Sequence, residues 1–566
     1  MKRFFNMIEK LINGEMIPLA LLLGLVAIIS YVHIGQSISL GKYHLQWGIN
    51  NLLSNYDLFH HSFKEFLFRT SVLHPGNSES EWHTISFLLP LFVFSDLIGG
   101  LSLKTICLFT VTGSLIFLSL FYGWIKEFWG KPTALWAAFF LGFSSIFQEI
   151  ARSGSYDAVS LLIAIGWCFY LFRLGNGEKL MPYFIWGLLT ALTWYGYGIL
   201  RSLTLIALAQ VLLSKILKKK QALGLFLLGM MLVLIPGFLI KIWVEGIDLN
   251  HYHAPAYTLL IDRESAFGWN FETMVKEVLI NVKVFAQRML GANQLLEPVF
   301  INRTHAPFWD HLLLIPLLIG VWQTIKRKEY YPNQLLVILS FFIFLAPCLL
   351  TSSKGFEEAR RSLLYIIPGY CFIGLGTKEI LQWINNFKNV QIKNAINIIF
   401  FGIVFIIVII EFSFVQSYII SSNRDFGMIE FAHQINKIHS VRYIYYLEHS
   451  TSNSAHDYPD NHLIKPLDRQ SIYRFADESE LLRVALMQKG KIDYHVKSGT
   501  APDQVPFLPN TYYVVKSPCV SFEEFDNWCV LNHLKAKTLI TSNVQNESSV
   551  NPVSPFGFYF VEKTPG

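Results

Sequence analysis

Two kinds of side chain in this sequence could do chemistry, and both occur where long apolar segments give way to polar ones. Asp57, Glu79 and Glu81 supply carboxylates in the first polar stretch after an apolar run. A carboxylate within hydrogen-bond reach of a hydroxyl is a suitable general base. Basic groups that could hold an anion recur later in the chain, and arginine binds phosphate through two parallel N–H donors. These basic residues are Arg152, Arg201, Lys354, Arg360 and Arg361.

No motif adds an obvious cofactor to these groups. The sequence has no zinc-ligand spacing, phosphate-binding P-loop, nucleophile elbow or dinucleotide fingerprint. Histidines cluster in the same polar stretches, and His251-Tyr-His253 comes nearest to a metal-ligand pair, but no clear carboxylate partners accompany it. The sequence therefore predicts no certain cofactor, and a divalent metal stays open as an alternative.

The elements that must position these residues are strongly apolar. Of the 566 residues 52% are hydrophobic and only 15% charged, whereas a soluble protein carries about 25% charged residues. The mean hydropathy is +0.39. The net charge of +6 comes from residues at the ends of apolar segments and not from one basic patch, so it does not indicate nucleic-acid binding. The composition predicts a mostly α-helical polytopic membrane protein.

Eleven apolar runs approach the length of a membrane-spanning helix, which needs about 20 mostly apolar residues. Several runs are short, and the two that meet at Arg201 could instead form one bent helix. The predicted spans are 16–34, 105–125, 133–149, 157–173, 182–199, 201–215, 222–244, 311–325, 333–351, 362–377 and 395–419.

Clusters of Lys and Arg fix the orientation of these spans, because short basic loops resist translocation. The clusters fall in alternate loops, which places the N-terminus in the cytoplasm and the C-terminus outside. The predicted outside segments are 35–104, 245–310 and the tail from 421. We expect a multi-pass protein of the inner (plasma) membrane of a bacterium, with a membrane domain at 1–420.

The tail at 421–566 is predicted to be a small extracytoplasmic α/β domain. It is polar, and strand-like runs at 441–447, 511–515 and 556–561 alternate with helix-like runs. Cys519 and Cys529 lie there, apart from the other four cysteines, and are expected to form a disulfide on an oxidising side of the membrane.

One further apolar run lies in the first outside segment. The run 83–97 is short and contains Pro90, so a helix lying in the membrane interface is expected there instead of a span.

Three stretches of sequence together carry a family resemblance. They are HTISFLLPLFVF, FWGKPTALWAA and ARSGSYDA within 83–173, GLLTALTWYGYGILR at 187–201, and RRSLLYIIP at 360–368. In their order and topology, over roughly residues 16–420, they resemble the GT-C glycosyltransferases. These polytopic enzymes use a lipid-phosphate sugar and include the protein O-mannosyltransferases and the lipid A aminoarabinose transferase.

The resemblance implies transfer of a sugar from a polyprenyl-phosphate donor to a lipid, glycan or protein acceptor at the extracytoplasmic face. The acceptor hydroxyl must lose a proton as it attacks the anomeric carbon. Asp57 is the first candidate for the base, with Glu79 or Glu81 next. The chain departs from the family at 43–48, where YHLQWG stands in place of an acidic pair. Asp57 could also be an ordinary turn or helix-capping residue.

The resemblance also implies a positive site for the donor phosphate, whose developing charge needs groups held in place beforehand. Arg201 and one of Arg360 and Arg361 are the first candidates, followed by Lys354. Each of them could instead anchor its helix to lipid headgroups. Arg152 could bind substrate or pair structurally with Asp157 nearby in sequence.

Two other classes of protein compete with the transferase. A polytopic transporter or channel with a sensing tail would carry buried charges within its spans, and few charges fall in the middle of any predicted span. A catalytically inactive GT-C-like scaffold would explain the missing acidic pair.

Overall fold

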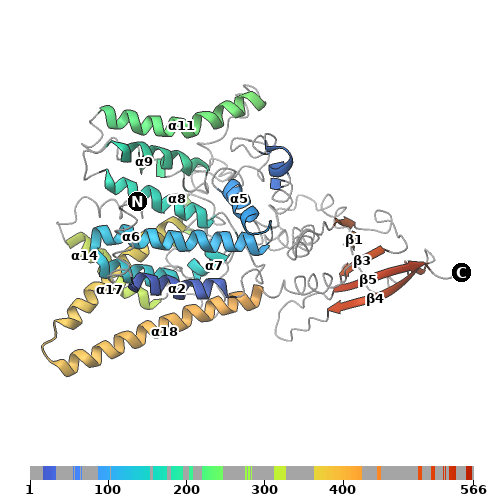
Figure 1. Ribbon diagram of the computed structural model, residues 1–566. Coiled ribbons are helices and arrows are strands. Elements are labelled where there is room, and N and C mark those ends of the chain that lie inside the picture. The colour runs from blue at the N-terminus through green and yellow to red at the C-terminus, as the bar shows by residue number, and fades with distance from the viewer. Residues whose placement is uncertain are drawn as a thin grey trace. The chain divides into compact units, whose positions relative to one another are not determined.

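The computed structural model describes the main helices and strands of the chain (Figure 1). Described are residues 17–32, 87–101, 103–152, 157–174, 180–195, 220–245, 311–326, 363–422, 443–447, 495–499, 511–516, 534–542 and 556–563, with scattered residues at 55–66, 154, 200–207, 275–283 and 527–530. The chain divides into two compact units. The first comprises 1–32, 58–91 and 108–418, and the second comprises 33–57, 92–107 and 419–566.

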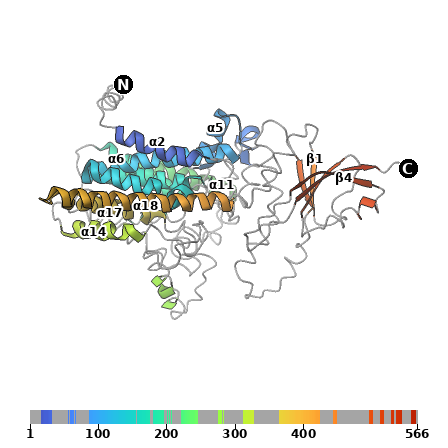
Figure 2. The same ribbon diagram turned by 90° about the horizontal axis from the view of Figure 1, so that it is seen from below.

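Helices form the described part of the first unit, as the apolar runs predict. They are α2 (Ile17–Tyr31), α6 (Leu103–Phe143), α7 (Ser145–Arg152), α8 (Asp157–Arg173), α9 (Met181–Leu192), α11 (Lys220–Glu245), α14 (Leu314–Lys326), α17 (Leu363–Asn385) and α18 (Val390–Ser422). Short 3₁₀ turns, Thr193–Tyr195 and His311–Leu313, follow α9 and precede α14. The long helices run roughly side by side in two perpendicular views (Figures 1 and 2). Most of the described chain is helical, as predicted.

The expected spans agree with these helices to different degrees. The span 157–173 coincides with α8, and the spans 16–34, 222–244 and 311–325 correspond to α2, α11 and α14 with its preceding turn. The helix of the span 182–199 ends early, at Leu192. The span 333–351 and most of 201–215 fall outside the described residues, so the count of eleven spans stays a prediction.

The expected span 105–125 and most of the expected span 133–149 lie in α6, and the rest of 133–149 reaches into α7. Gly130 interrupts the helix with φ 81° and ψ 169°, a conformation that glycine adopts without a Cβ penalty. Pro132 follows it, where a proline suits the first turn of a new helix. The Leu118 side chain lies against Gly142, so the chain reverses at Gly130 and the two halves of α6 pack against each other.

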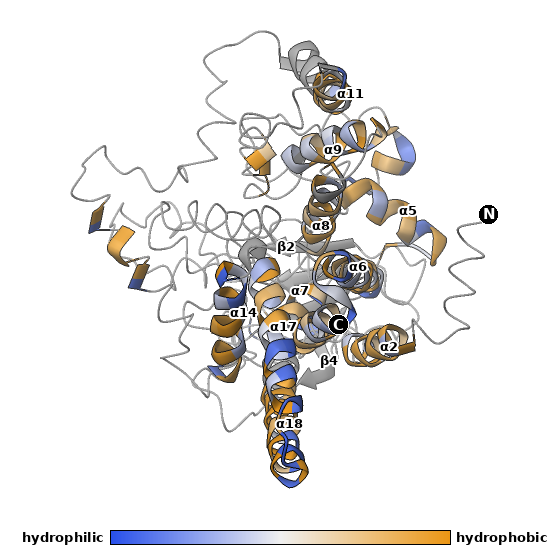
Figure 3. Cartoon of the chain, turned by 90° about the vertical axis from the view of Figure 1, so that its left-hand side faces the viewer, coloured by the Kyte–Doolittle hydropathy of each residue, from blue (hydrophilic) through white to orange (hydrophobic). Residues whose placement is uncertain are grey.

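Length and composition make two of the described helical segments suitable for crossing a membrane, Lys104–Phe143 and Val390–Ser413. Five shorter apolar helices accompany them. In Figure 3 α18 is orange along much of its length, and large apolar side chains such as Ile398, Phe401 and Phe405 are exposed on it. An apolar exterior of this kind suits contact with lipid.

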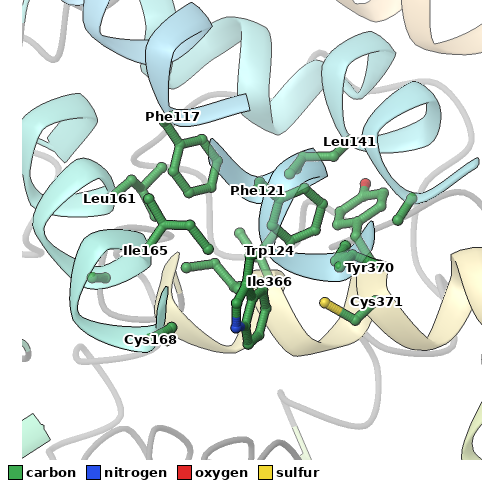
Figure 4. Packing of buried hydrophobic residues seen from close by; sticks show 14 of the residues in the cluster. Phe117, Phe121, Trp124, Leu141, Leu161, Ile165, Cys168, Ile366, Tyr370 and Cys371 are labelled. Carbon is green, nitrogen blue, oxygen red and sulfur yellow. The ribbon is translucent and has the colours of Figure 1, made fainter. Parts of the chain in front are cut away.

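The core of the first unit lies between α6, α8 and α17. Figure 4 shows Phe117, Phe121 and Trp124 of α6 gathered with residues of α8 and α17, among them Ile165 and Tyr370. Inside a membrane, such side chains stabilise the bundle mainly through van der Waals packing, because lipid tails are as apolar as they are.

Glycines bring two helix pairs into close contact. On α17, a Cβ at Gly376 would overlap the Pro316 carbonyl oxygen of α14, and a Cβ at Gly320 of α14 would overlap the Phe372 carbonyl. Gly187 of α9 stands in the same relation to the Phe226 carbonyl of α11. Small residues of this kind let helix backbones approach each other inside membranes.

The second unit contains a five-stranded sheet with strand order β2-β1-β3-β5-β4. Its strands are β1 (Tyr443–Leu447), β2 (His495–Gly499), β3 (Thr511–Lys516), β4 (Leu534–Ser542) and β5 (Phe556–Lys563). β1 pairs in parallel with β2 and β3, whereas β5 pairs antiparallel with β3 and β4. Three strands match the predicted runs.

Less of the tail's predicted helical content is described. Asn527, Cys529 and Val530 are helical there, and the other expected helices lie outside the described residues. The α/β class of the tail and its extracytoplasmic side stay predictions. Cys529 is buried, but Cys519 is not described, so the disulfide also stays a prediction.

Candidate functional site

Of the eight predicted site residues, the structure describes one, Arg152. The predicted carboxylates Asp57, Glu79 and Glu81 lie outside the described residues, as do the basic residues Arg201, Lys354, Arg360 and Arg361. Their roles therefore stay predictions. The described residues around Arg152 in the first unit, and around Tyr56 in the second, form two separate polar arrangements.

Arg152 ends the short helix α7 and is only 1% exposed. Its Nη1 donates a hydrogen bond to the Ile29 carbonyl oxygen at 3.0 Å, in the last turn of α2. A cation near the C-terminal carbonyls of a helix is favourable, because those carbonyls carry the negative end of the helix dipole. This contact gives Arg152 a structural role that the sequence did not predict, because it fixes α7 to the end of α2, whereas the expected pairing with Asp157 stays a prediction.

The start of α7 is capped from two directions. The Ser144 hydroxyl oxygen accepts the Phe147 N–H at 3.3 Å, which is the usual N-cap arrangement. The Ser145 N–H donates to Glu411 Oε2 of α18 at 2.6 Å. A carboxylate at a helix N-terminus is stabilised by the positive end of the helix dipole. Glu411 is 6% exposed and stands within the predicted apolar span 395–419.

The middle of α7 is held by Gln148, which is 1% exposed. Its Nε2 donates to the Gly142 carbonyl at 2.7 Å, and its Oε1 is 2.8 Å from the Ser30 hydroxyl of α2. Near the other end, Thr110 Oγ1 of α6 donates to the Ala151 carbonyl at 2.8 Å. These contacts form the α7 network, which ties α7 to α2, α6 and α18.

The first predicted outside segment contributes a second arrangement, around Tyr56. The Tyr56 hydroxyl donates to Asp96 Oδ1 at 2.6 Å, and its ring meets Phe92 edge to face at 5.2 Å between centroids. Asp96 and Phe92 belong to α5 (Leu89–Leu97), which is too short to span a membrane, as predicted for the run 83–97.

Burial of Tyr56 and its hydrogen bond to the negatively charged Asp96 raise the pKa of the phenol to about 12, although a hydrogen bond with the Leu101 backbone lowers it somewhat. The phenol is therefore protonated at neutral pH and serves as a hydrogen-bond donor.

Sequence reasoning missed the residues that join these elements. Glu411 is a buried charge within an apolar run, a signal that could have singled it out. Gln148 and Tyr56 carry no comparable signal, because their partners lie far away in sequence.

Among the described residues, no group of three or more His, Cys, Asp and Glu side chains could hold a metal ion.

The chain has the fold of the GT-C glycosyltransferases, as the three sequence stretches predict. This conclusion follows from similarity to solved structures along almost the whole chain. No protein-family model matches the sequence, and neither does any curated protein.

Two solved proteins illustrate the similarity. ArnT from Cupriavidus metallidurans bound to undecaprenyl phosphate is similar at a TM-score of 0.51, with 9% identity over 95% of this chain and 97% of ArnT. The archaeal oligosaccharyltransferase AglB from Archaeoglobus fulgidus, in complex with an inhibitory peptide and a dolichol-phosphate, is similar at a TM-score of 0.50. Its identity is 10%, over 96% of this chain and 76% of AglB.

Proposed function

We propose that this protein is a polytopic membrane glycosyltransferase that moves a sugar from a polyprenyl-phosphate donor to an acceptor at the extracytoplasmic face. The single observation that supports it best is the GT-C fold shared along nearly the full length with ArnT, whose structure holds undecaprenyl phosphate. AglB, with a dolichol-phosphate, supports the same class of lipid donor. The acceptor would be a lipid, a glycan or a protein.

The reaction forms a bond between the acceptor oxygen and the anomeric carbon and breaks the bond from that carbon to the phosphate oxygen. The hydroxyl proton passes to a carboxylate, for which Asp57 is our choice, with Glu79 and Glu81 as alternatives. The polyprenyl phosphate leaves with its charge balanced by a positive group, for which Arg201 or Arg361 is our choice. Arg360 and Lys354 are alternatives for this role.

The transporter alternative gains little from Glu411, a buried carboxylate within the predicted span 395–419. Charges inside membrane spans commonly mark ion or substrate pathways. Glu411, however, is bound to the Ser145 N–H at the start of α7, and this structural contact accounts for its place. The transferase is therefore the better supported function.

The decisive experiment incubates the purified protein in lipid nanodiscs with radiolabelled polyprenyl-phosphate sugars and a panel of lipid, glycan and peptide acceptors. We expect transfer of label from one donor, and loss of about 10²–10⁴-fold in rate for Asp57→Asn, which removes the base and keeps its shape. Donor binding without transfer under all conditions would support an inactive scaffold. Solute flux in proteoliposomes without transfer would support a transporter.

A further inference from the structure

The turn that joins α17 to α18 presents large apolar side chains to its surroundings. Trp383, in the last turn of α17, and Phe387, just after that helix, are each 48% exposed. Val390 and Ile392, at the start of α18, are also exposed. In two perpendicular views α17 and α18 extend beyond the ends of α6 and α14, and this turn lies at their tip (Figures 1 and 2). We call residues 383–393 the α17–α18 tip.

The tip carries two lysines and no acidic residue. Lys388 lies in the turn and Lys393 near the start of α18, and the sequence from 380 to 410 contains neither Asp nor Glu. In the described part of the chain neither lysine forms an ion pair, whereas the nearby Lys378 has the Glu379 carboxylate at 3.7 Å. The tip is therefore positively charged as well as apolar.

Hydrogen bonds fix the shape of the tip. Asn389 Oδ1 accepts the N–H groups of Gln391 and Ile392, at 2.9 and 3.3 Å, and so caps the start of α18. The Phe387 N–H donates to the Ile384 carbonyl at 3.3 Å and closes the end of α17. Because the turn is already ordered, a ligand that binds it loses little affinity to the entropy of ordering the chain.

Beyond the tip, α18 continues as an exposed apolar helix. Its 33 residues extend about 50 Å at about 1.5 Å per residue, whereas the hydrocarbon core of a bilayer is about 30 Å thick. Ile398, Ile399 and Phe405 are exposed on it, so the surface suited to lipid tails begins shortly after Lys393. Tryptophan and lysine are the residues that typically occupy the boundary between lipid tails and headgroups.

We propose that the α17–α18 tip lies in the headgroup layer of the membrane and binds anionic phospholipid. Trp383 and Phe387 anchor the tip at this depth, and the ammonium groups of Lys388 and Lys393 attract the lipid phosphates. The predicted topology places the tip on the cytoplasmic side, where the leaflet contains anionic lipids. The inference is independent of the proposed transferase activity, because it uses no residue of the proposed donor or acceptor site.

Photolabelling in nanodiscs tests the proposal at the tip itself. Phosphatidylglycerol and phosphatidylcholine with the same photoreactive acyl chain are compared at equal mole fraction, and labelling of the segment 383–393 is quantified by peptide mass spectrometry. We expect the anionic lipid to label the wild-type tip more strongly. Lys388→Gln combined with Lys393→Gln should lower this preference by up to about 30-fold, since a lysine near the bilayer surface contributes about 1 kcal/mol and tenfold corresponds to about 1.4 kcal/mol.

Three further variants separate charge from anchoring. Lys388→Arg combined with Lys393→Arg keeps both charges and should keep the preference. Trp383→Ala should reduce labelling by both lipids and leave their ratio unchanged. Lys535→Gln is the matched control, because it removes an exposed lysine from β4 of the second unit, and we expect no effect at the tip.

Two results would overturn the proposal. The first is an equal ratio of the two labels in the wild-type protein and in the double glutamine variant. The second is a loss of preference in Lys535→Gln as large as in that variant, because the effect would then reflect net charge alone. Absence of labelling by either lipid would also refute the proposal and would favour an acidic soluble protein as the partner of the tip.

Discussion

Gln148 gives the sharpest test of the α7 network, because Gln148→Met keeps the length of the side chain and removes its polar atoms. The variant leaves the buried Gly142 carbonyl without the donor that lies at 2.7 Å. An unsatisfied buried acceptor costs about 1–3 kcal/mol. The Ser30 hydroxyl loses less, because the Val26 carbonyl, also at 2.8 Å, can accept its proton instead. We therefore expect the free energy of unfolding to fall by about 1–3 kcal/mol, mostly through Gly142.

A thermodynamic cycle with Ser30→Ala divides this loss between the two bonds. Hydrogen bonds between helices of membrane proteins average about 0.6 kcal/mol in such cycles, so the coupling between Ser30 and Gln148 should be of that size. Unfolding would be followed in detergent micelles by denaturant titration. Gln391→Met is the matched control, because Gln391 is exposed at the start of α18 and should change stability little. Equal stability of Gln148→Met and the wild-type protein would refute the network as a source of stability.

Three further predictions follow from described contacts and from the charge pattern. Gly376→Ala should destabilise the protein, because its Cβ meets α14 backbone, whereas Gly402→Ala on the open side of α18 should be neutral or stabilising; thermal unfolding in detergent compares them. The raised pKa of Tyr56, about 12 against a usual 10, means that the folded state keeps this proton longer. Its contribution to stability is complete below pH 10 and is lost as the pH rises through 12, and an ultraviolet difference titration of wild type against Tyr56→Phe would detect it. When fused after residue 430, a reporter that works only outside the cytoplasm should be active. Activity of a reporter that works only in the cytoplasm, fused at the same point, would contradict the predicted topology.

Hydropathy predicts a span well where charged residues bound its apolar run, as Asp157 and Arg173 do. The span 157–173 coincides with α8, because its apolar run has clear polar limits. The prediction of the span 133–149 is less accurate, because α6 ends at Phe143 and a separate helix, α7, begins two residues later. Gly130 marks the reversal between 105–125 and 133–149, and its positive φ is a feature that a glycine in sequence permits but does not prescribe.

The polar contacts of the candidate site could not be predicted in the same way. Gln148 and Ser30 are 118 residues apart, and Ser145 and Glu411 are 266 apart. Periodicity reports only which face of a helix is apolar and does not identify the partner of a buried polar group. The sequence therefore indicates Arg152 as a functional candidate, whereas the structure shows that one of its donors is bound to the Ile29 carbonyl.

The two polar arrangements differ in a way that bears on function. In the α7 network, the buried Gln148 and Glu411 each bind a backbone group, and buried polar groups in folded proteins are expected to be satisfied in this manner. Stability alone is a sufficient reason for these residues. Asp96 differs, because it is exposed and stands at the end of a helix where its charge is unfavourable. A contact maintained against a local cost is more typical of a functional site than of a core. The stability of α5 alone therefore does not account for the charge of Asp96.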